Sequence, residues 1–285
     1  MKLKNNLSLG LIAVACALTA QVASAQKAGD NFVYGGMAFS KTNSSLGPVS
    51  DSQAAFSSFT TGTTATIENF STAIISAVHM YTDNVGVELT LGIPPKLKAD
   101  ITAPSVAPLG LVSTPMNSAI TQTALFPSVV GMYMFKTPGE KIRPYVGLGV
   151  NYTTYSSISP NTSFNTVAAF AGNGVSLSSS WNPVYKLGAI YNIDDRWSIN
   201  AGLAYVPLST NVTLQANNAI TPHNLANTAT AKLTINPTDF TIKVGYKFWS
   251  NFIFPVKAPI STATQFGGGS IRGFFAGLMT LNMVF

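Results

Sequence analysis

The sequence predicts an all-β fold, a transmembrane antiparallel β-barrel of a bacterial outer membrane. The clearest sign is the segment 240–248, FTIKVGYKF, in which every second residue is Phe, Ile, Val or Tyr and the others are Thr, Lys or Gly. Because successive side chains of a strand point to opposite faces, this segment has one apolar and one polar surface. The pattern recurs behind a secretory leader in a chain of which 46% of the residues are hydrophobic. A second sign is the alternation of short and long connections between the candidate strands.

Residues 1–25 form the expected leader. Two lysines precede the apolar stretch 7–18, and an A-x-A site ends at Ala25. These features predict a signal peptide cleaved after Ala25, because the apolar stretch is shorter than the roughly 20 residues of a spanning helix. The only cysteine, Cys16, lies inside the leader, and lipoprotein cleavage in front of it is the alternative.

The composition favours a membrane barrel over a soluble domain. Charged residues make up 9% of the chain, against roughly 25% in a typical soluble domain. The formal net charge of +6 comes from a low number of acidic residues and not from clusters of Lys and Arg, so no nucleic-acid partner is expected. We expect one barrel domain over residues 26–248, followed by a C-terminal extension over 249–285.

Eight candidate strands follow one another without a linker. Their expected bounds are 31–41, 68–81, 85–94, 122–136, 142–155, 181–192, 197–208 and 231–248. Long connections rich in Ser, Thr, Asn and Ala occupy 42–67, 95–121, 156–180 and 209–230, and they alternate with short turns. Outer-membrane barrels have this arrangement, with the short turns on the periplasmic side.

The facing of the strands follows from their charges. The expected lipid-facing side chains are Val85, Val87, Leu89, Leu91, Ile93, Pro144, Val146, Leu148, Val150, Tyr152, Tyr185, Leu187, Ala189, Tyr191, Trp197, Ile199, Ala201, Leu203 and Tyr205. The opposite faces carry Glu88, Arg143, Lys186, Ser198, Asn200, Asp239, Lys243 and Lys247. A basic residue facing lipid at mid-depth costs about 2–4 kcal/mol, so the reverse facing is disfavoured.

Several stretches resemble the OmpW family of small outer-membrane barrels. They are MYTDNVGVEL (80–89), KIRPYVGLGVNYTTY (141–155), YKLGAIYNIDDRWSINAGLAYVPLSTNV (185–212) and LTINPTDFTIKVGYKF (233–248). The resemblance implies eight strands around a narrow and largely hydrophobic interior. It also implies passage of small apolar molecules across the outer membrane, and some members of the family are receptors for bacteriocins.

The chain departs from the family after Phe248, where family members end. Residues 275–285 alternate again and finish in Phe285, which resembles the C-terminal signal that the barrel-assembly machinery reads. An added strand pair would give a ten-stranded barrel. Pro255 and Pro259 disfavour a central strand there, and the alternative is an eight-stranded barrel with an associated tail.

Two groups of interior residues are candidate functional sites. Glu88, Arg143, Lys186 and Lys243 are expected to form a charge network in the lumen, either as structural ion pairs or as a selectivity filter. The strand 122–136 is apolar on both faces. The resemblance to the family implies that its inward side chains are Phe126, Ser128, Val130, Met132 and Met134. These side chains either line a groove for an apolar solute or fill the core.

Enzymatic signals are weak. The two histidines, His79 and His223, lie in no nucleophile or metal-ligand spacing, so we expect no enzyme, metal or cofactor. The expected function is a porin-like barrel for passive uptake of small hydrophobic molecules; the alternative is a non-conducting surface receptor or structural protein. The expected partners are outer-membrane lipids, small apolar solutes and, during biogenesis, the barrel-assembly machinery.

Overall fold

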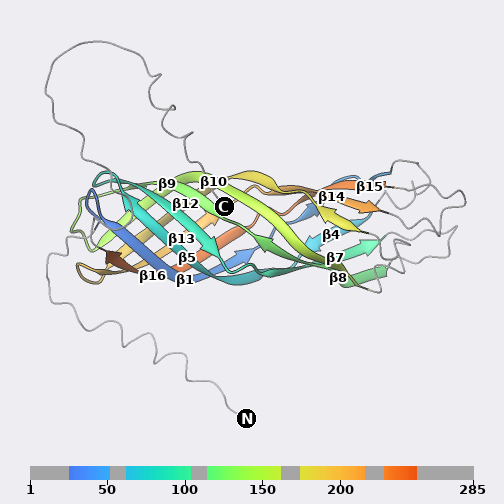
Figure 1. Cartoon of the computed structure of the whole chain (residues 1–285), viewed down its shortest axis with the longest axis horizontal. Helices are drawn as coiled ribbons and strands as arrows, with labels where there is room; N and C mark the ends of the chain where they lie inside the picture. The colour runs from blue at the N-terminus through green and yellow to red at the C-terminus, as the bar shows by residue number, and fades with distance from the viewer. Residues whose placement is uncertain (1–25, 52–61, 104–113, 162–173, 216–227, 249–285) are drawn as a thin grey trace, which may run out of the picture. The chain divides into compact units, whose positions relative to one another are not determined.

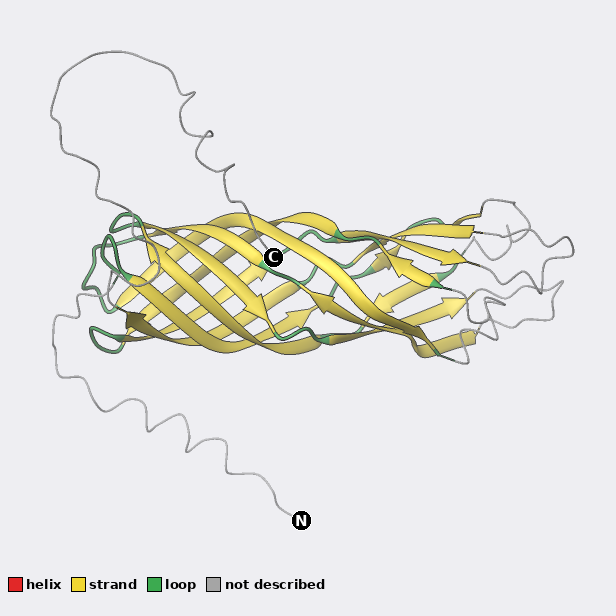
Figure 2. Cartoon of the chain, viewed as in Figure 1, coloured by secondary structure: helices red, strands yellow, loops and turns green. Residues whose placement is uncertain are grey.

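The computed structural model describes residues 26–51, 62–103, 114–161, 174–215 and 228–248. These residues form strands joined by turns and irregular segments (Figure 2). Among them no helix is long and apolar enough to cross a bilayer. The expected leader with Cys16, His223 and the C-terminal extension over 249–285 lie outside the described residues.

Eight antiparallel strands close into a barrel. They are β1 (Asn31–Lys41), β5 (Phe70–Met80), β6 (Val85–Gly92), β9 (Ser128–Met134), β10 (Ile142–Pro160), β12 (Ser180–Asn192), β13 (Trp197–Tyr205) and β16 (Thr238–Phe248). Each pairs with its neighbour in this order, and β1 pairs with β16 from Asn31↔Phe248 to Lys41↔Thr238. Because this pairing closes the sheet, no edge is left for another strand pair, and the ten-stranded alternative is wrong.

One end of the barrel, here called the turn end, carries the short connections 81–84, 135–141 and 193–196. The wall continues beyond the other end, the loop end, as further strands (Figure 1). These are β2 (Ser45–Leu46), β3 (Ser50–Asp51), β4 (Thr64–Ile67), β7 (Lys96–Ala103), β8 (Thr114–Leu125), β11 (Val175–Leu177), β14 (Ser209–Gln215) and β15 (Thr228–Thr234). One outer sheet joins β4, β7 and β8 to the part of β10 nearest the loop end. The other outer sheet joins β11, β14, β15, β2 and β3.

The four predicted long connections do lie at the loop end, but the prediction that they are loops is wrong, because each carries strands. In β7, for example, Leu97 and Ala99 are buried while Lys96 and Lys98 are exposed, so this segment does alternate. Its apolar face is partly built from small residues such as Ala, which makes the alternation weak in the sequence. Pairing with β4 and β8 satisfies the backbone groups of β7, which a loop would leave to water.

Two of the predicted strands are each divided by a proline. The predicted strand 122–136 is β8 and β9, separated at Phe126-Pro127. The predicted strand 231–248 is β15 and β16, separated over 235–237, where Asn236 has a positive φ of 42° and Pro237 follows. Proline has no N–H to donate to a ladder, so the sheet pairing changes at these positions.

The predicted facing of the barrel strands is confirmed. Leu89, Leu148, Leu187 and Leu203 are exposed on the outside of the barrel, whereas Glu88 and Lys243 are buried inside it. Aromatic rings gather toward both ends of the wall. Trp197 and Tyr246 lie 4.9 Å apart between ring centroids near the turn end, and Tyr152 and Trp181 lie 4.8 Å apart near the loop end. This is an apolar belt between two aromatic girdles, as a bilayer requires.

The interior of the barrel near the turn end is filled by side chains. Tyr34 is fully buried, and its ring lies against Gly245, its register partner on β16. A Cβ at position 245 would overlap the ring, so glycine is required there by close approach.

We expect Gly245→Ala to lower the free energy of unfolding by about 1–3 kcal/mol, because the added methyl group overpacks the interior. Denaturant titration in detergent micelles measures this. Gly35→Ala is the matched control, because nothing lies within 4 Å of a Cβ at that exposed position on β1. Equal stabilities of the two variants would contradict the prediction.

Candidate functional site

A buried ion-pair layer crosses the lumen. Glu88 on β6 accepts hydrogen bonds from the ammonium groups of Lys186 on β12 and Lys243 on β16, one on each carboxylate oxygen. The side chain of Glu88 is completely buried, and those of Lys186 and Lys243 are 7% and 1% exposed. The three residues come together because each is flanked by lipid-facing apolar residues, which turn the charged side chain inward.

Two tyrosines pack against this layer. The Lys186 ammonium group lies 5.8 Å from the ring centroid of Tyr145, and that of Lys243 lies 5.4 Å from the ring centroid of Tyr34. Tyr145 donates a hydrogen bond to Asn200 Oδ1 at 2.9 Å. The charges are therefore enclosed by cation–π and hydrogen-bond partners, which a buried ion pair needs to offset its desolvation.

Arg143 does not take part in this network, contrary to the sequence prediction. Its guanidinium group lies at the turn end and donates to three backbone carbonyl oxygens: Gln26 at 2.8 Å, Asp83 at 2.5 Å and Lys136 at 3.2 Å. Arg143 is the second residue of β10, whereas Glu88 is the fourth of β6. The two side chains share the interior but lie at different heights, which sequence alternation does not reveal.

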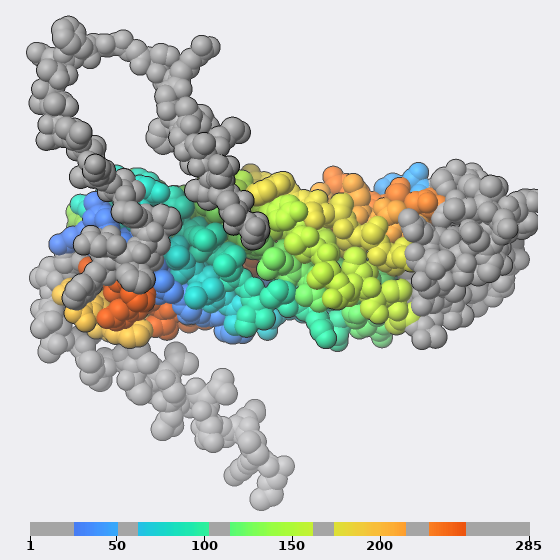
Figure 3. Space-filling view, viewed as in Figure 1, coloured from blue at the N-terminus to red at the C-terminus, as the bar shows by residue number. Residues whose placement is uncertain are grey.

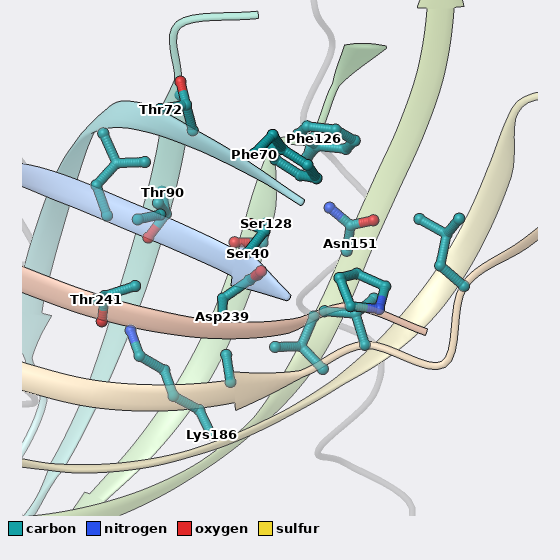
Figure 4. A pocket seen from close by; sticks show the side chains of 18 of the residues that line it. Ser40, Phe70, Thr72, Thr90, Phe126, Ser128, Asn151, Lys186, Asp239 and Thr241 are labelled. Atoms are coloured by element: carbon teal, nitrogen blue, oxygen red, sulfur yellow. The ribbon is translucent and has the colours of Figure 1, made fainter. Parts of the chain in front are cut away.

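A cavity of about 110 Å³ lies above the ion-pair layer, on the side of the loop end. Its walls are mainly apolar, and Lys186, Lys243 and Asp239 contribute charged groups to its lining. Lys186 and Asp239 are labelled in Figure 4. The main apolar side chains of the walls are Phe70, Phe126, Val184, Val206, Leu208 and Ile235. The rings of Phe70 and Phe126 stack with centroids 5.8 Å apart.

The predicted groove residues divide between this cavity and the filled section. Phe126, Ser128 and Val130 line the cavity. Met132 and Met134 also point inward and are 2% and 0% exposed, but they lie closer to the turn end and belong to the buried core. Since β9 runs along the barrel wall, only the residues near its start reach the level of the cavity.

Sequence reasoning missed most of the cavity wall. Val206, Leu208 and Ile235 lie between strands; Val206 and Leu208 flank Pro207, and Ile235 lies two residues before Pro237. The usable signal was the period-two alternation, which continues past the end of each strand: Ala204, Val206 and Leu208 are all buried, and so are Leu233 and Ile235.

A second cavity of about 80 Å³ lies between the two outer sheets. Its lining is almost entirely apolar and includes Leu46, Ala65, Ile101, Ile120, Leu177 and Leu214. All six belong to segments that the sequence predicted as loops. The part of the protein beyond the loop end is therefore folded around apolar space.

The ladder between β6 and β9 ends beside the first cavity. Their ladder runs from Val85↔Tyr133 to Thr90↔Ser128. Above it, β6 leads through Ile93-Pro94-Pro95 into β7, which pairs with β8 instead of β9. Figure 3 shows the outer surface of the wall in the same view as Figure 1. Between Thr90↔Ser128 and the start of the β7–β8 ladder at Lys96↔Thr123, the two sides of the junction are joined by a backbone hydrogen bond from Ala124 N–H to Pro95 O at 3.1 Å.

Within the described ranges, no group of three or more His, Cys, Asp or Glu residues could hold a metal ion. His79 lies at the turn end of β5, where its Nδ1 is 2.8 Å from Asn31 Oδ1. This contact joins two adjacent strands and gives the ring a structural partner.

Comparison with known proteins identifies the family. The model of the OmpW family matches residues 27–248. Outer membrane protein W of Vibrio cholerae serotype O1 is 28% identical over 239 residues, which cover 83% of this chain and 97% of that protein. Outer membrane protein W of Escherichia coli strain K12 is 27% identical over 243 residues, which cover 85% and 99%. The crystal structure of the outer membrane protein OprG from Pseudomonas aeruginosa has the same fold, with a TM-score of 0.65 at 24% identity over 79% of this chain and 99% of that one. The chain is a member of the OmpW family, and its barrel lies in the bacterial outer membrane.

Proposed function

We propose that this barrel takes up small hydrophobic molecules passively and delivers them to the outer membrane. The observation that carries the proposal is the mainly apolar cavity directly above a filled barrel section. Ligand sites are typically concave and apolar with a few placed polar groups, which describes this cavity. The family resemblance supports the same class of solute.

The entry route runs through the outer sheets. The second cavity offers apolar surface on the side of the loop end, which faces the medium in outer-membrane barrels. A hydrophobic solute that leaves water there gains free energy in proportion to the apolar area it buries. It then passes to the first cavity, which is closer to the membrane.

The exit is sideways into the bilayer. Straight passage to the periplasm is blocked by the Glu88 ion pairs, by Tyr34 and Tyr145, and by Arg143 with its carbonyl partners. Eight-stranded barrels are in general filled by side chains. The junction of β6 and β9 above Thr90 is the favoured exit, because the ladder between the two strands ends there.

Substitution of Ala204 by Trp tests the proposal. Ala204 on β13 lines the first cavity, so the indole ring of Ala204→Trp fills the space that a solute needs. We expect uptake of an apolar fluorescent probe into proteoliposomes to fall at least about tenfold, toward the rate of protein-free vesicles. Ala201→Trp is the matched control, since Ala201 lies on the same strand and faces lipid.

Heat-modifiable migration in gels verifies that both variants fold. If wild-type protein at matched density transports no faster than empty vesicles, the transport proposal is wrong. The filled section of the barrel near the turn end then favours the alternative, a surface receptor whose outer sheets bind a partner.

A further inference from the structure

The first cavity contains an unusual polar atom. Asp239, the second residue of β16, lines the cavity together with Ser40 (Figure 4). Ser40 is its register partner on β1 and hydrogen-bonds the carboxyl group. The Asp239 Oδ1 atom is nevertheless buried without a hydrogen-bond partner among the described residues. An unsatisfied buried acceptor is costly, so it favours a ligand that can donate a hydrogen bond to it.

The polar lining also offers donors. Lys186 and Lys243 line the same cavity, and Lys186 is close enough to act electrostatically on Asp239. Each ammonium group has three N–H donors; Glu88 accepts one bond from each, and Ser76 Oγ accepts a further bond from Lys243 at 3.3 Å. The lining therefore presents an acceptor and donors in one cavity. A hydroxyl group can use both, because it has one O–H to donate and lone pairs to accept.

The charges around the cavity are balanced. Two ammonium groups, on Lys186 and Lys243, face two carboxyl groups, on Glu88 and Asp239. A charged ligand head would add an uncompensated charge to a poorly solvated site, which is strongly unfavourable. A neutral head group avoids this penalty.

We infer that the first cavity binds neutral amphiphiles with a hydroxyl head, such as medium-chain alcohols, in preference to plain alkanes and to fatty carboxylates. The hydroxyl donates to Asp239 Oδ1, and the alkyl chain packs against Phe70, Phe126 and Leu208 on the cavity wall. This inference rests on the proposed function and specifies its substrate class.

Methyl NMR of isoleucine-labelled protein in nanodiscs tests it. The δ1 methyl groups of Ile74 and Ile235 report on the cavity, and that of Ile193, exposed in a turn, reports on general effects of the solute on the bilayer. 1-Octanol, n-octane and octanoate are titrated, with affinities expressed against the mole fraction of each compound in the lipid. We expect 1-octanol to bind at least about tenfold more tightly than n-octane, as for a hydrogen bond to a charged group.

Two variants of Asp239 assign the preference to its side chain. Asp239→Ala removes the acceptor and is expected to bring the affinities for octanol and octane within about twofold of each other. Asp239→Asn keeps an acceptor oxygen at the same position and is expected to retain the preference for octanol.

The outcomes separate the two proposals. If octane and octanol bind equally to the wild type, or if octanoate binds as tightly as octanol, the hydroxyl preference is wrong while uptake of apolar solutes stands. If no compound shifts the cavity methyl groups, the proposed function itself fails. A preference that persists in Asp239→Ala would assign the hydroxyl to another residue and overturn the inference.

Discussion

Replacement of Glu88 by Gln is expected to lower the free energy of unfolding by about 3–5 kcal/mol. The carboxylate is the shared partner of Lys186 and Lys243, and all three side chains are buried. Without it, two ammonium groups remain in the barrel interior with no anion between them, and breaking a buried ion pair on one side typically has an effect of this size. Urea titration of the refolded protein in lipid vesicles, followed by tryptophan fluorescence, measures it.

Glu68→Gln is the control for this prediction. Glu68 pairs with Lys98 at 3.9 Å, but both side chains are about half exposed. Surface pairs contribute about 0–1 kcal/mol, so this variant is expected to stay close to the wild type. A loss below about 1 kcal/mol for Glu88→Gln would show that the ion pairs do not hold the barrel together.

A double-mutant cycle on Glu88 and Lys186 separates pairing from packing. If the network is structural, the two substitutions are strongly non-additive, because the second removes a charge that the first left unpaired. Replacing Glu88, Lys186 and Lys243 together by Leu and Met is expected to recover much of the lost stability, since a well-packed apolar set can replace a buried ion-pair group. Additive effects would contradict the network.

Leu148→Arg is expected to lower stability by about 2–4 kcal/mol in lipid vesicles. Leu148 is 63% exposed on the outside of β10, at the middle of the paired part of the strand. An arginine there lies in the hydrocarbon region, where its desolvation is greatest.

Val85→Arg is the depth control for Leu148→Arg. Val85 also faces outward but is the first residue of β6, next to the turn end, so an effect of about 0–1 kcal/mol is expected. Equal effects at the two positions, or no effect at either, would contradict a lipid-facing belt. Spin labels at Leu148 and Leu203 offer a second readout and are expected to report a lipid environment.

The candidate site was predicted only in part. The inward facing of Glu88, Lys186 and Lys243 follows from alternation. Adjacent residues of a strand face opposite sides, and the apolar neighbours of each of these residues face lipid. The meeting of these residues on one carboxylate depends on the heights at which β6, β12 and β16 align, and register is a property of paired strands. For the same reason the sequence could not separate Arg143 from this group.

The cavity was harder to predict than the charges. Phe126 and Val130 were identified from their strand. Val206, Leu208 and Ile235 continue the inward alternation of β13 and β15 into the segments beside Pro207 and Pro237, and the sequence did not single them out as part of a site. The folded outer sheets were missed because their strands use small residues such as Ala99, whose alternation with polar residues is weak. Only strand pairing turns these segments into a wall around apolar space.

The sequence by itself determined the fold class, the membrane-facing surface and the family, because period-two alternation and the charge of each face are local properties of a strand. The tertiary structure decided the closure at eight strands, the separation of Arg143 from the ion pairs, and the position of the cavity with its unpartnered Asp239 oxygen. These features arise between strands that are far apart in the chain. They depend on register and on the breaks at prolines, which no single strand specifies.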